Sequence, residues 1–402
     1  MLLGTQPDVS CASDRGVRCG MIADDLTGAC DAGVQFAERG FSALVRVGVG
    51  EEAAEIAVMV TNSRNDPPEA ARAKVLHACE TLHKERRAVL FKKIDSTLRG
   101  NLGAEIATAL ESSGASLALV APSFPAQGRT LEAGRLRING IAMARGHLPT
   151  LLREQGVERM AHISRQFLIG GARALTARLD EAAKTAPTVV TVDAITEEDL
   201  VLLAQAAEDY PARILMVGSA GLAAAVAQLL ATRYARRASP LGQAQSAAKA
   251  GLVALVVGST TPVTAEQLTQ FMVTHRCAVF DLPTTNLWPI RRALRERRHV
   301  ILRVAFQGEL RRCLARCRKV LIEHDVRGVI LSGGETATMA CEAWEARGIR
   351  LEREIAPGLP WGRLAGGPAE GLPLATKAGS FGDRDALNVM AEFLAQQPKV
   401  SR

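Results

Sequence analysis

The strongest constraint on the fold of this chain is a repeated alternation of short apolar segments with longer amphipathic segments. Apolar segments that fit strands occupy residues 17–23, 43–49, 56–62, 88–94 and 116–122. Residues 67–85 and 101–113 have apolar side chains at helical spacing, and a further helix is expected from Thr27 as its N-cap through Gln35 to Arg39. Strands that alternate with helices predict an α/β fold with a mostly parallel sheet flanked by helices.

The same alternation restarts after residue 250, which predicts a second domain of similar construction. Strands are expected over 252–259, 328–333 and 372–376, and helices from Thr264, from Thr336 and over 384–395. The tract 233–250, RYARRASPLGQAQSAAKA, is polar and has no apolar stripe. A chain of 402 residues is long enough for two domains. We predict a disordered leader over 1–17, one domain over 18–240 that includes the start of the linker, and a second over 250–402.

The composition argues against a membrane protein or a zinc protein. The chain has no run of about 18 apolar residues, and its first residues lack the basic and apolar regions of a signal peptide. None of the 8 cysteines forms a CxxC pair, and Cys313 and Cys317 have no matching His or Cys pair for a zinc site. Scattered cysteines that stay reduced predict a cytoplasmic protein.

The net charge of +7 comes largely from the arginine-rich segment 291–319. Such a segment is also found in nucleic-acid-binding proteins. Only 4% of the residues are aromatic, however, so the chain offers few platforms on which single-stranded bases could stack. Arginines on solvated helix faces are the favoured interpretation, and no nucleic-acid partner is predicted.

Polar and charged residues follow four predicted strands of the first domain. In chain order they include Asp24, Asp25, Thr27 and Gly28, then Ser63 and Arg64, then Asp95, Ser96 and Arg99, then Ser123, Gln127 and Arg129. Ligands of parallel sheets bind beyond the carboxyl ends of the strands, so these side chains are expected around one cleft. Arginine can grip a carboxylate through two hydrogen bonds, and aspartate can accept hydrogen bonds from hydroxyls. The cleft therefore suits a small polyhydroxylated anion.

Each of these residues also has a purely structural interpretation. Asp24 or Asp25 could cap the following helix, Arg64 could lie on the surface, and Asp95 with Ser96 could belong to a turn. All of these structural roles would have to hold together, which favours a shared site.

The two lysines that precede Asp95 are expected to have different surroundings. Lys92 and Lys93 point to opposite faces if the strand continues through them. Lys93, on the side of Asp95, is the one expected to face the cleft.

Three glycine-rich turns between a strand and a helix mark the second domain. They contain Gly258 and Ser259, then Gly333 and Gly334, then Gly379 and Gly382, and Thr264 with Gln267 could form a capping box. Backbone N–H groups in such turns can bind phosphates. Neither GxxxxGK[ST] nor GxGxxG occurs, so these turns indicate nucleotide binding without a standard motif.

These segments together resemble one known family. IADDLTGACDAGVQFAERG, TNSR, KKIDSTLRGNLGAEI, APSFPAQGRT, VVGSTTPVTAEQ, LSGGETA, APGLPWG and TKAGSFGD are similar to blocks of the four-carbon acid sugar kinases, in that family's order, over about residues 20–390. The resemblance implies an acid-sugar-binding domain followed by a nucleotide-binding domain. It also implies transfer of phosphate from ATP, with Mg²⁺, to the 4-hydroxyl of the sugar, and an enzyme that could associate as a homo-oligomer.

The resemblance also implies the site residues. Substrate contacts are expected at Asp24 or Asp25, Arg64, Lys93, Asp95 and Ser96, and ATP contacts at Ser259, Gly333, Gly334, Glu335, Thr336 and Gly379. The implied mechanism aligns the sugar hydroxyl with the γ-phosphate, with one of the two adjacent aspartates as base. Asp25 is the favoured base because it lies nearer the helix start.

The block KKIDSTLRGN is similar to the D-threonate and D-erythronate kinases of this family rather than to the 3-oxo-tetronate kinases. One segment departs from the family: INGIAMARGHLPTLLREQGVERM, within residues 138–160, has no clear counterpart and is expected to shape the substrate pocket. The alternatives are a 3-oxo-tetronate kinase, a non-catalytic acid-sugar-binding protein, and a dinucleotide-dependent oxidoreductase, against which the missing GxGxxG argues.

Overall fold

The structure is a computed structural model that describes residues 12–13, 16–17, 19–47, 53–184, 188–236 and 250–398. Two short strands, β1 (Ala12–Ser13) and β2 (Gly16–Val17), belong to the segment predicted as a leader. The rest of that segment, and residues 237–249 of the predicted linker, lie outside the described residues.

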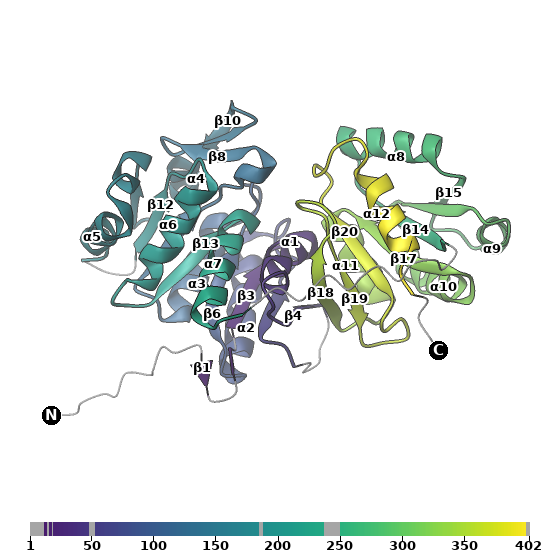
Figure 1. Cartoon of the computed structure of the whole chain (residues 1–402), viewed down its shortest axis with the longest axis horizontal. Helices are drawn as coiled ribbons and strands as arrows, with labels where there is room; N and C mark the ends of the chain where they lie inside the picture. The colour runs from purple at the N-terminus through teal and green to yellow at the C-terminus, as the bar shows by residue number, and fades with distance from the viewer. Residues whose placement is uncertain are drawn as a thin grey trace.

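Fifteen strands of the described residues form one continuous sheet through both halves of the chain (Figure 1). Eight parallel strands make up the N-terminal part, in the order β11 (Met160–Ile163), β12 (Thr188–Val192), β7 (Leu117–Ala121), β13 (Ile214–Gly218), β6 (Ala88–Lys93), β3 (Cys19–Ala23), β5 (Ile56–Val60) and β4 (Ala43–Arg46). The mostly parallel α/β fold predicted from the sequence is confirmed.

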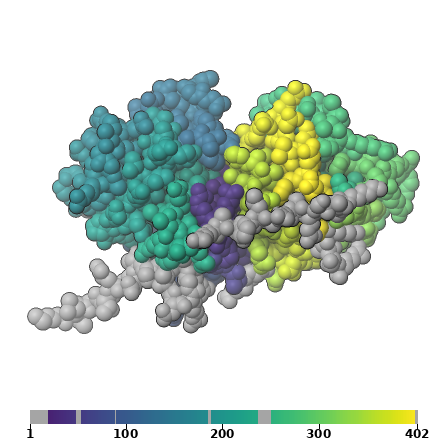
Figure 2. Space-filling model, in the orientation of Figure 1, coloured from purple at the N-terminus to yellow at the C-terminus, as the bar shows by residue number. Residues whose placement is uncertain are grey.

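The C-terminal part of the sheet continues from β4 through two antiparallel neighbours. The order is β18 (Gly348–Glu354), β19 (Pro360–Ala365), β20 (Pro373–Lys377), β17 (Val326–Ser332), β14 (Leu252–Val257), β16 (His299–Val304) and β15 (Cys277–Leu282). β20 and the four strands after it are parallel. Figure 2 shows the resulting two lobes side by side. The pairing of β4 with β18 joins them, which no local sequence pattern predicted.

Helices cover both faces of the sheet. One face packs against α1 (Leu26–Ala37), α5 (Gly171–Ala183), α6 (Glu197–Glu208), α7 (Ala220–Arg233), α9 (Trp288–Arg295), α10 (Leu310–Glu323) and α11 (Gly334–Ala343). There are two further clusters of buried apolar side chains. One packs against α2 (Pro68–Lys84), α3 (Leu102–Ser113) and α4 (Leu148–Glu154), and the other packs against α8 (Pro262–Thr274) and α12 (Ala386–Ala395). Two 3₁₀ helices, η1 (Pro125–Gln127) and η2 (Arg165–Leu168), complete the set.

Burial on both faces explains why the strands are continuous apolar runs. In β14, Leu252, Ala254 and Val256 belong to one core cluster, whereas Val253, Leu255 and Val257 belong to another. Because successive strand side chains point to opposite faces, a strand covered on both faces must be apolar at every position.

A small antiparallel sheet stands apart from the main one and consists of β8 (Arg129–Glu132), β9 (Arg135–Ile138) and β10 (Ile141–His147). It contains much of the segment that departs from the family pattern. No residue of 138–160 lines the pocket described below, so the structure gives no support to the expectation that this segment shapes it.

Several expected helix starts and one expectation about cysteines were wrong. Asp25, not Thr27, is the N-cap of α1, and its side chain accepts a hydrogen bond from Gly28 N–H. α11 begins at Gly334, two residues before the expected Thr336. The cysteines were expected to be reduced, but Cys19 is disulfide-bonded. The expectation was wrong because the spacing of cysteines in the sequence does not show which of them meet in the fold.

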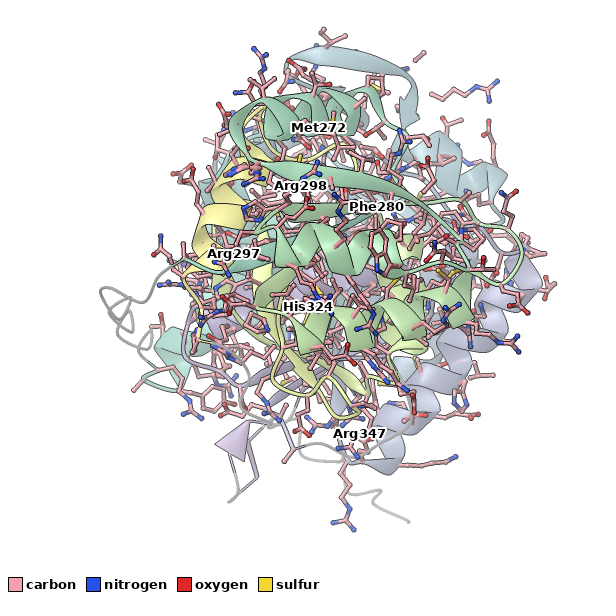
Figure 3. All side chains as sticks on the ribbon, turned by 90° about the vertical axis from the view of Figure 1, so that its right-hand side faces the viewer. Met272, Phe280, Arg297, Arg298, His324 and Arg347 are labelled. Atoms are coloured by element: carbon pink, nitrogen blue, oxygen red, sulfur yellow. The ribbon has the colours of Figure 1, made fainter. Side chains whose placement is uncertain are left out.

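The arginine-rich segment lies on the outer side of the C-terminal lobe, which Figure 3 views directly. Its arginines form ion pairs with neighbouring acids, for example Arg297 with Asp325 at 2.9 Å and Arg292 with Glu296 at 2.7 Å. This agrees with arginines on solvated helix faces. Among the described residues, no helix is both long enough and apolar enough to cross a membrane.

Candidate active site

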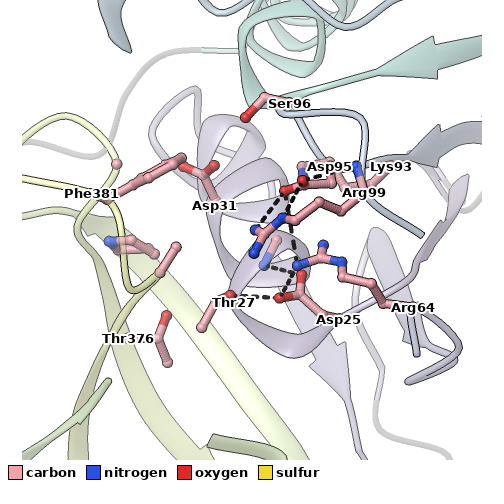
Figure 4. A pocket seen from close by; sticks show the side chains of 14 residues that line it. Asp25, Thr27, Asp31, Arg64, Lys93, Asp95, Ser96, Arg99, Thr376 and Phe381 are labelled. Carbon is pink, nitrogen blue, oxygen red and sulfur yellow. Dashed lines mark hydrogen bonds and ion pairs between the residues drawn. The ribbon is translucent and has the colours of Figure 1, made fainter. Parts of the chain in front are cut away.

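A polar pocket lies where strand ends and loops of both lobes converge (Figure 4). The N-terminal lobe contributes Asp25, Thr27, Gly28, Asp31, Arg64, Lys93, Asp95, Ser96 and Arg99, and the C-terminal lobe contributes Gly358, Pro360, Thr376, Ala378 and Phe381. Five residues predicted to bind or transform the substrate therefore line one pocket: Asp25, Arg64, Lys93, Asp95 and Ser96.

Arg64 links the predicted carboxylates to one another. Its Nε and Nη2 donate to the two oxygens of Asp24 at 2.6 and 2.9 Å, and its Nη1 donates to Asp25 Oδ2 at 2.9 Å. Burial opposes ionisation of Asp24, but the charge of Arg64 and its hydrogen bonds hold the pKa of Asp24 below its ordinary value. Asp24 is not among the residues that line the pocket, and its hydrogen bonds with Arg64 connect it to the pocket wall.

Asp25 both caps a helix and lines the pocket. As the N-cap of α1, its Oδ1 accepts from Gly28 N–H at 2.8 Å, and its Oδ2 accepts from Thr27 Oγ1 at 2.8 Å as well as from Arg64. The same carboxylate lines the pocket. Fixed in this way at a helix start, Asp25 is held in one orientation before any ligand arrives.

Asp95 is held chiefly by Arg99, four residues further on. Arg99 Nε and Nη2 donate to the two Asp95 oxygens at 2.7 and 3.1 Å, and Thr97 Oγ1 donates to Oδ2. Burial alone would raise the pKa of Asp95, but the hydrogen bonds from Arg99 and the charge of Arg64 hold it below the ordinary value. Asp95 is therefore ionised at neutral pH.

The two adjacent lysines at the end of β6 lie in different environments, as predicted. Lys92 is fully buried, and its Nζ lies 2.6 Å from Glu105 Oε2. Lys93 lines the pocket, and its Nζ donates to the carbonyl oxygen of Ile94 at 2.9 Å. A Cβ atom on Gly28 would lie 2.9 Å from Lys93 Nζ, so the ammonium sits directly against the start of α1.

Arg129 connects Ser96 to the C-terminal lobe. Its Nη1 donates to Ser96 Oγ at 2.6 Å, its Nη2 lies 3.5 Å from Ser380 Oγ, and its guanidinium stacks 4.3 Å above the ring centroid of Phe381. Phe124 packs edge-on against the same ring. The loop that follows β20 is thereby docked on the N-terminal lobe.

The glycine-rich turns of the C-terminal lobe lie close together, as the resemblance implied. A Cβ atom on Gly379 would lie 2.4 Å from Ser259 Oγ, and one on Gly333 would lie 3.5 Å from the backbone nitrogen of Ser259. Gly333 precedes α11 with φ of 103°, a conformation that favours glycine. No side chain caps the start of α11, where the exposed Glu335 lies in the first turn, so its N–H groups are available to an anion.

Buried side chains of β20 and α8 hold the turn over 378–383. Lys377 Nζ donates to the carbonyl oxygens of Ala378, Gly379 and Phe381, and burial lowers the pKa of Lys377 to about 8. Gln267 Nε2 donates to carbonyl oxygens of the same turn. The capping box predicted for Thr264 and Gln267 was therefore wrong: Thr261 is the N-cap of α8.

The predicted base and the predicted nucleotide turn meet in this structure. A Cβ atom on Gly334, the first residue of α11, would lie 2.5 Å from Asp25 Oδ2. The start of α11 is thus next to the carboxylate that lines the pocket. An anion at this helix start and a ligand in the pocket would be neighbours.

The described residues include no group of three or more His, Cys, Asp or Glu side chains that could hold a metal ion. Mg²⁺ in nucleotide sites is commonly bound through phosphates, waters and one or two carboxylates rather than by a protein cage.

Sequence reasoning did not select several residues of this pocket. Asp31, Thr376 and Phe381 line it, and Asp31 could have been found because Thr27, Gly28 and Asp31 share one face of a helix. Thr376 and Phe381 come from the other lobe, and only the docking of the lobes brings them here.

Two domain models match this chain. A sugar-binding N-terminal domain matches residues 19–226, and a nucleotide-binding C-terminal domain matches residues 291–387. A charged pocket between a sugar-binding and a nucleotide-binding domain, next to glycine-rich turns, fits the class of sugar-acid kinases. The chain belongs to the four-carbon acid sugar kinase family.

Named relatives extend over nearly the whole chain. The D-threonate kinase of Salmonella typhimurium is 30% identical over 91% of this chain and 96% of its own. The D-threonate kinase of Bordetella bronchiseptica is 31% identical over 95% and 98%. A 3-oxo-tetronate kinase of Methylobacterium radiotolerans is 28% identical over 92% and 99%.

The fold is also found in solved structures. A Haemophilus influenzae protein matches with a TM-score of 0.70 at 22% identity and covers 94% of this chain and 99% of its own. A Salmonella typhimurium protein matches with a TM-score of 0.74 at 21% identity and covers 93% and 98%.

Proposed function

We propose that this enzyme transfers the γ-phosphate of ATP to the 4-hydroxyl of D-threonate or D-erythronate. The observation that carries the proposal is the contact of Asp25 with the start of α11. A phosphate bound by the helix N–H groups would lie beside the pocket that holds the sugar, which is the alignment that phosphoryl transfer requires.

The residues of the pocket have complementary roles in this proposal. Lys93 and Arg64 bind the sugar carboxylate, Ser96 and Asp95 complete the wall around it, and Asp24 keeps Arg64 in place. Asp25 accepts the proton of the attacking hydroxyl. Because the Asp25 carboxylate lies next to the phosphate site, the hydroxyl would lose its proton beside the phosphate that it attacks.

The nucleotide occupies the glycine-rich turns. Ser259, Gly333, Gly334, Thr336 and Gly379 provide backbone and hydroxyl donors to the phosphates, and Glu335 lies at the rim of the same site. Mg²⁺ would neutralise charge on the phosphates when bound, held mainly by the phosphates and by water. A cytoplasmic location and a homo-oligomeric state stay predictions.

The test is coupled ADP release with ATP and Mg²⁺ against a panel of four-carbon acids: D- and L-threonate, D- and L-erythronate, and the 2-oxo- and 3-oxo-tetronates. We expect the highest kcat/KM with D-threonate or D-erythronate. A clear preference for 3-oxo-tetronate would correct the substrate and keep the reaction. Thermal stabilisation by ATP without turnover of any acid would contradict the proposed acceptor.

Two glycine substitutions should separate the nucleotide site from the base. Gly379→Ala places a methyl group 2.4 Å from Ser259 Oγ, so it should raise the KM for ATP while leaving binding of the acid unchanged. Gly334→Ala should raise the KM for ATP and also lower kcat, because its methyl group would displace Asp25. We therefore expect a substitution at Gly334 to affect the residues proposed to act on the sugar as well as the nucleotide site. Steady-state kinetics in both substrates distinguish the two patterns, and identical effects of both variants would contradict this assignment.

A further inference from the structure

One oxygen of the Asp31 carboxylate lacks a hydrogen-bond donor in the described part of the chain. Asp31 lies on α1, is only 5% exposed and lines the pocket. Its Oδ1 has no hydrogen-bond partner among the described residues. A buried carboxylate oxygen without a donor is costly, so such a group in a pocket wall indicates a donor that arrives with a ligand.

Charged groups of both signs face Asp31 from the elements around it. Lys93 at the end of β6 and Arg129 at the start of β8 favour its ionised form, whereas Asp25 before α1 opposes it. Glu354 at the end of β18 is also close enough for the charges of the two acids to repel each other. Burial is the largest influence, and it raises the pKa of Asp31 to about 6. Asp31 is therefore largely ionised at pH 7 and above, and it can accept hydrogen bonds but not donate them.

Asp25 and Asp31 differ in how many of their carboxylate oxygens already accept hydrogen bonds. Both Asp25 oxygens already accept hydrogen bonds from Gly28, Thr27 or Arg64, and Asp25 lies against the start of α11. Asp31, one to two turns further along the helix, lies on the side of Phe381, as Figure 4 shows. The two carboxylates therefore suit different parts of one small ligand.

We propose that Asp31 is a substrate-binding, specificity-determining residue that accepts a hydrogen bond from a hydroxyl of the acid sugar other than the one phosphorylated. This assignment rests on the proposed function. The ligand class it selects is a short 2- or 3-hydroxylated carboxylic acid. A hydroxyl of this kind supplies the donor that Asp31 lacks, and a deoxy acid leaves the carboxylate buried and unpaired.

The experiment combines a variant with substrate analogues. Wild type and Asp31→Asn are assayed with the best C4 acid from the panel, with its 2-deoxy analogue (3,4-dihydroxybutanoate) and with its 3-deoxy analogue (2,4-dihydroxybutanoate). In wild type, removing the hydroxyl that Asp31 contacts should lower kcat/KM about 10- to 100-fold. In Asp31→Asn the same removal should cost much less, since the interaction is already weakened. Asp281→Asn on β15, whose carboxylate is exposed, is the control and should behave like wild type.

Coupling between Asp31 and either hydroxyl supports the proposal and identifies the hydroxyl. Equal losses in wild type and variant for both analogues overturn it, and a large fall in kcat with unchanged KM would indicate the base instead. Wild type that turns over no four-carbon acid would refute the proposed function, and this inference with it. Turnover by wild type without coupling would refute this inference alone.

A second measurement needs only wild-type protein, in case Asp31→Asn does not fold. A hydroxyl donor favours ionised Asp31, so the affinity for the acid measured by calorimetry should rise as pH increases from about 5 through 6 and then level off. The analogue that lacks the contacted hydroxyl should lose this rise. Glu354→Gln should retain it, which separates Asp31 from the neighbouring acid. A pH dependence that is the same for the acid and both analogues would contradict the proposal.

Discussion

Replacement of Asp25 by asparagine is expected to lower kcat by roughly 10²–10⁴-fold, the range typical for the loss of a general base. The amide has nearly the same shape and also caps helices well, so α1 should keep its start. What is lost is the negative charge and the ability to accept a proton beside the start of α11. Steady-state ADP release at saturating ATP and acid measures the effect.

The controls decide between a base and a binding residue. Asp281→Asn removes an exposed carboxylate paired with Arg303, and it should leave kcat unchanged because exposed ion pairs contribute little. Circular dichroism should show that Asp25→Asn is folded. If its turnover stays within a few-fold of wild type while the KM for the acid rises, Asp25 binds the substrate and another group is the base.

Replacement of Lys92 by methionine is expected to destabilise the fold by about 3–5 kcal/mol. Lys92 is fully buried, its partner Glu105 is 2% exposed, and the two charged groups are 2.6 Å apart. Removing the ammonium leaves the Glu105 carboxylate in the core, where, among the residues that the structure describes, the hydroxyl of Ser63 at 2.6 Å is the remaining side-chain partner. Urea unfolding followed by circular dichroism gives the change in free energy.

A double variant tests whether the cost comes from the unpaired charge. Lys92→Met with Glu105→Leu replaces both charges by apolar groups and should recover most of the lost stability, because a well-packed apolar pair can substitute for a buried ion pair. The adjacent Lys93→Met should change stability less than Lys92→Met, since Lys93 lines the pocket. A loss below about 1 kcal/mol for Lys92→Met would mean that the pair behaves like a surface ion pair.

About half of the main sheet and half of the twelve helices in the described part of the chain could be predicted, because the signals of these elements are local. β3, β5, β6 and β7 follow apolar runs that the sequence shows directly, and α2 and α3 follow helical spacing. Seven strands of the main sheet were not predicted: β11, β12, β13, β15, β16, β18 and β19. β18 and β19 pair antiparallel to one another. β18 also pairs antiparallel to β4, and this second pairing joins residues about 300 apart in the chain.

The candidate site divides in the same way. The polar residues after β3, β5 and β6 could be grouped, because the carboxyl ends of parallel strands share one edge of a sheet. The different environments of Lys92 and Lys93 followed from the two-residue period of a strand. The assignment of helix starts failed at Asp25 and Thr261, where several neighbouring residues can each serve as a cap and only the backbone conformation selects one.

The amino-acid sequence by itself determined the α/β class, the charged strand ends of the first lobe and the glycine-rich turns of the second. These depend on periodicity and on short motifs, which act over a few residues. Only the tertiary structure decided that Gly334 lies against Asp25, that Arg129 reaches Phe381 and that Asp31 Oδ1 has no hydrogen-bond donor among the described residues. Such contacts depend on how the lobes dock and on which donors burial leaves nearby, and no local pattern encodes either.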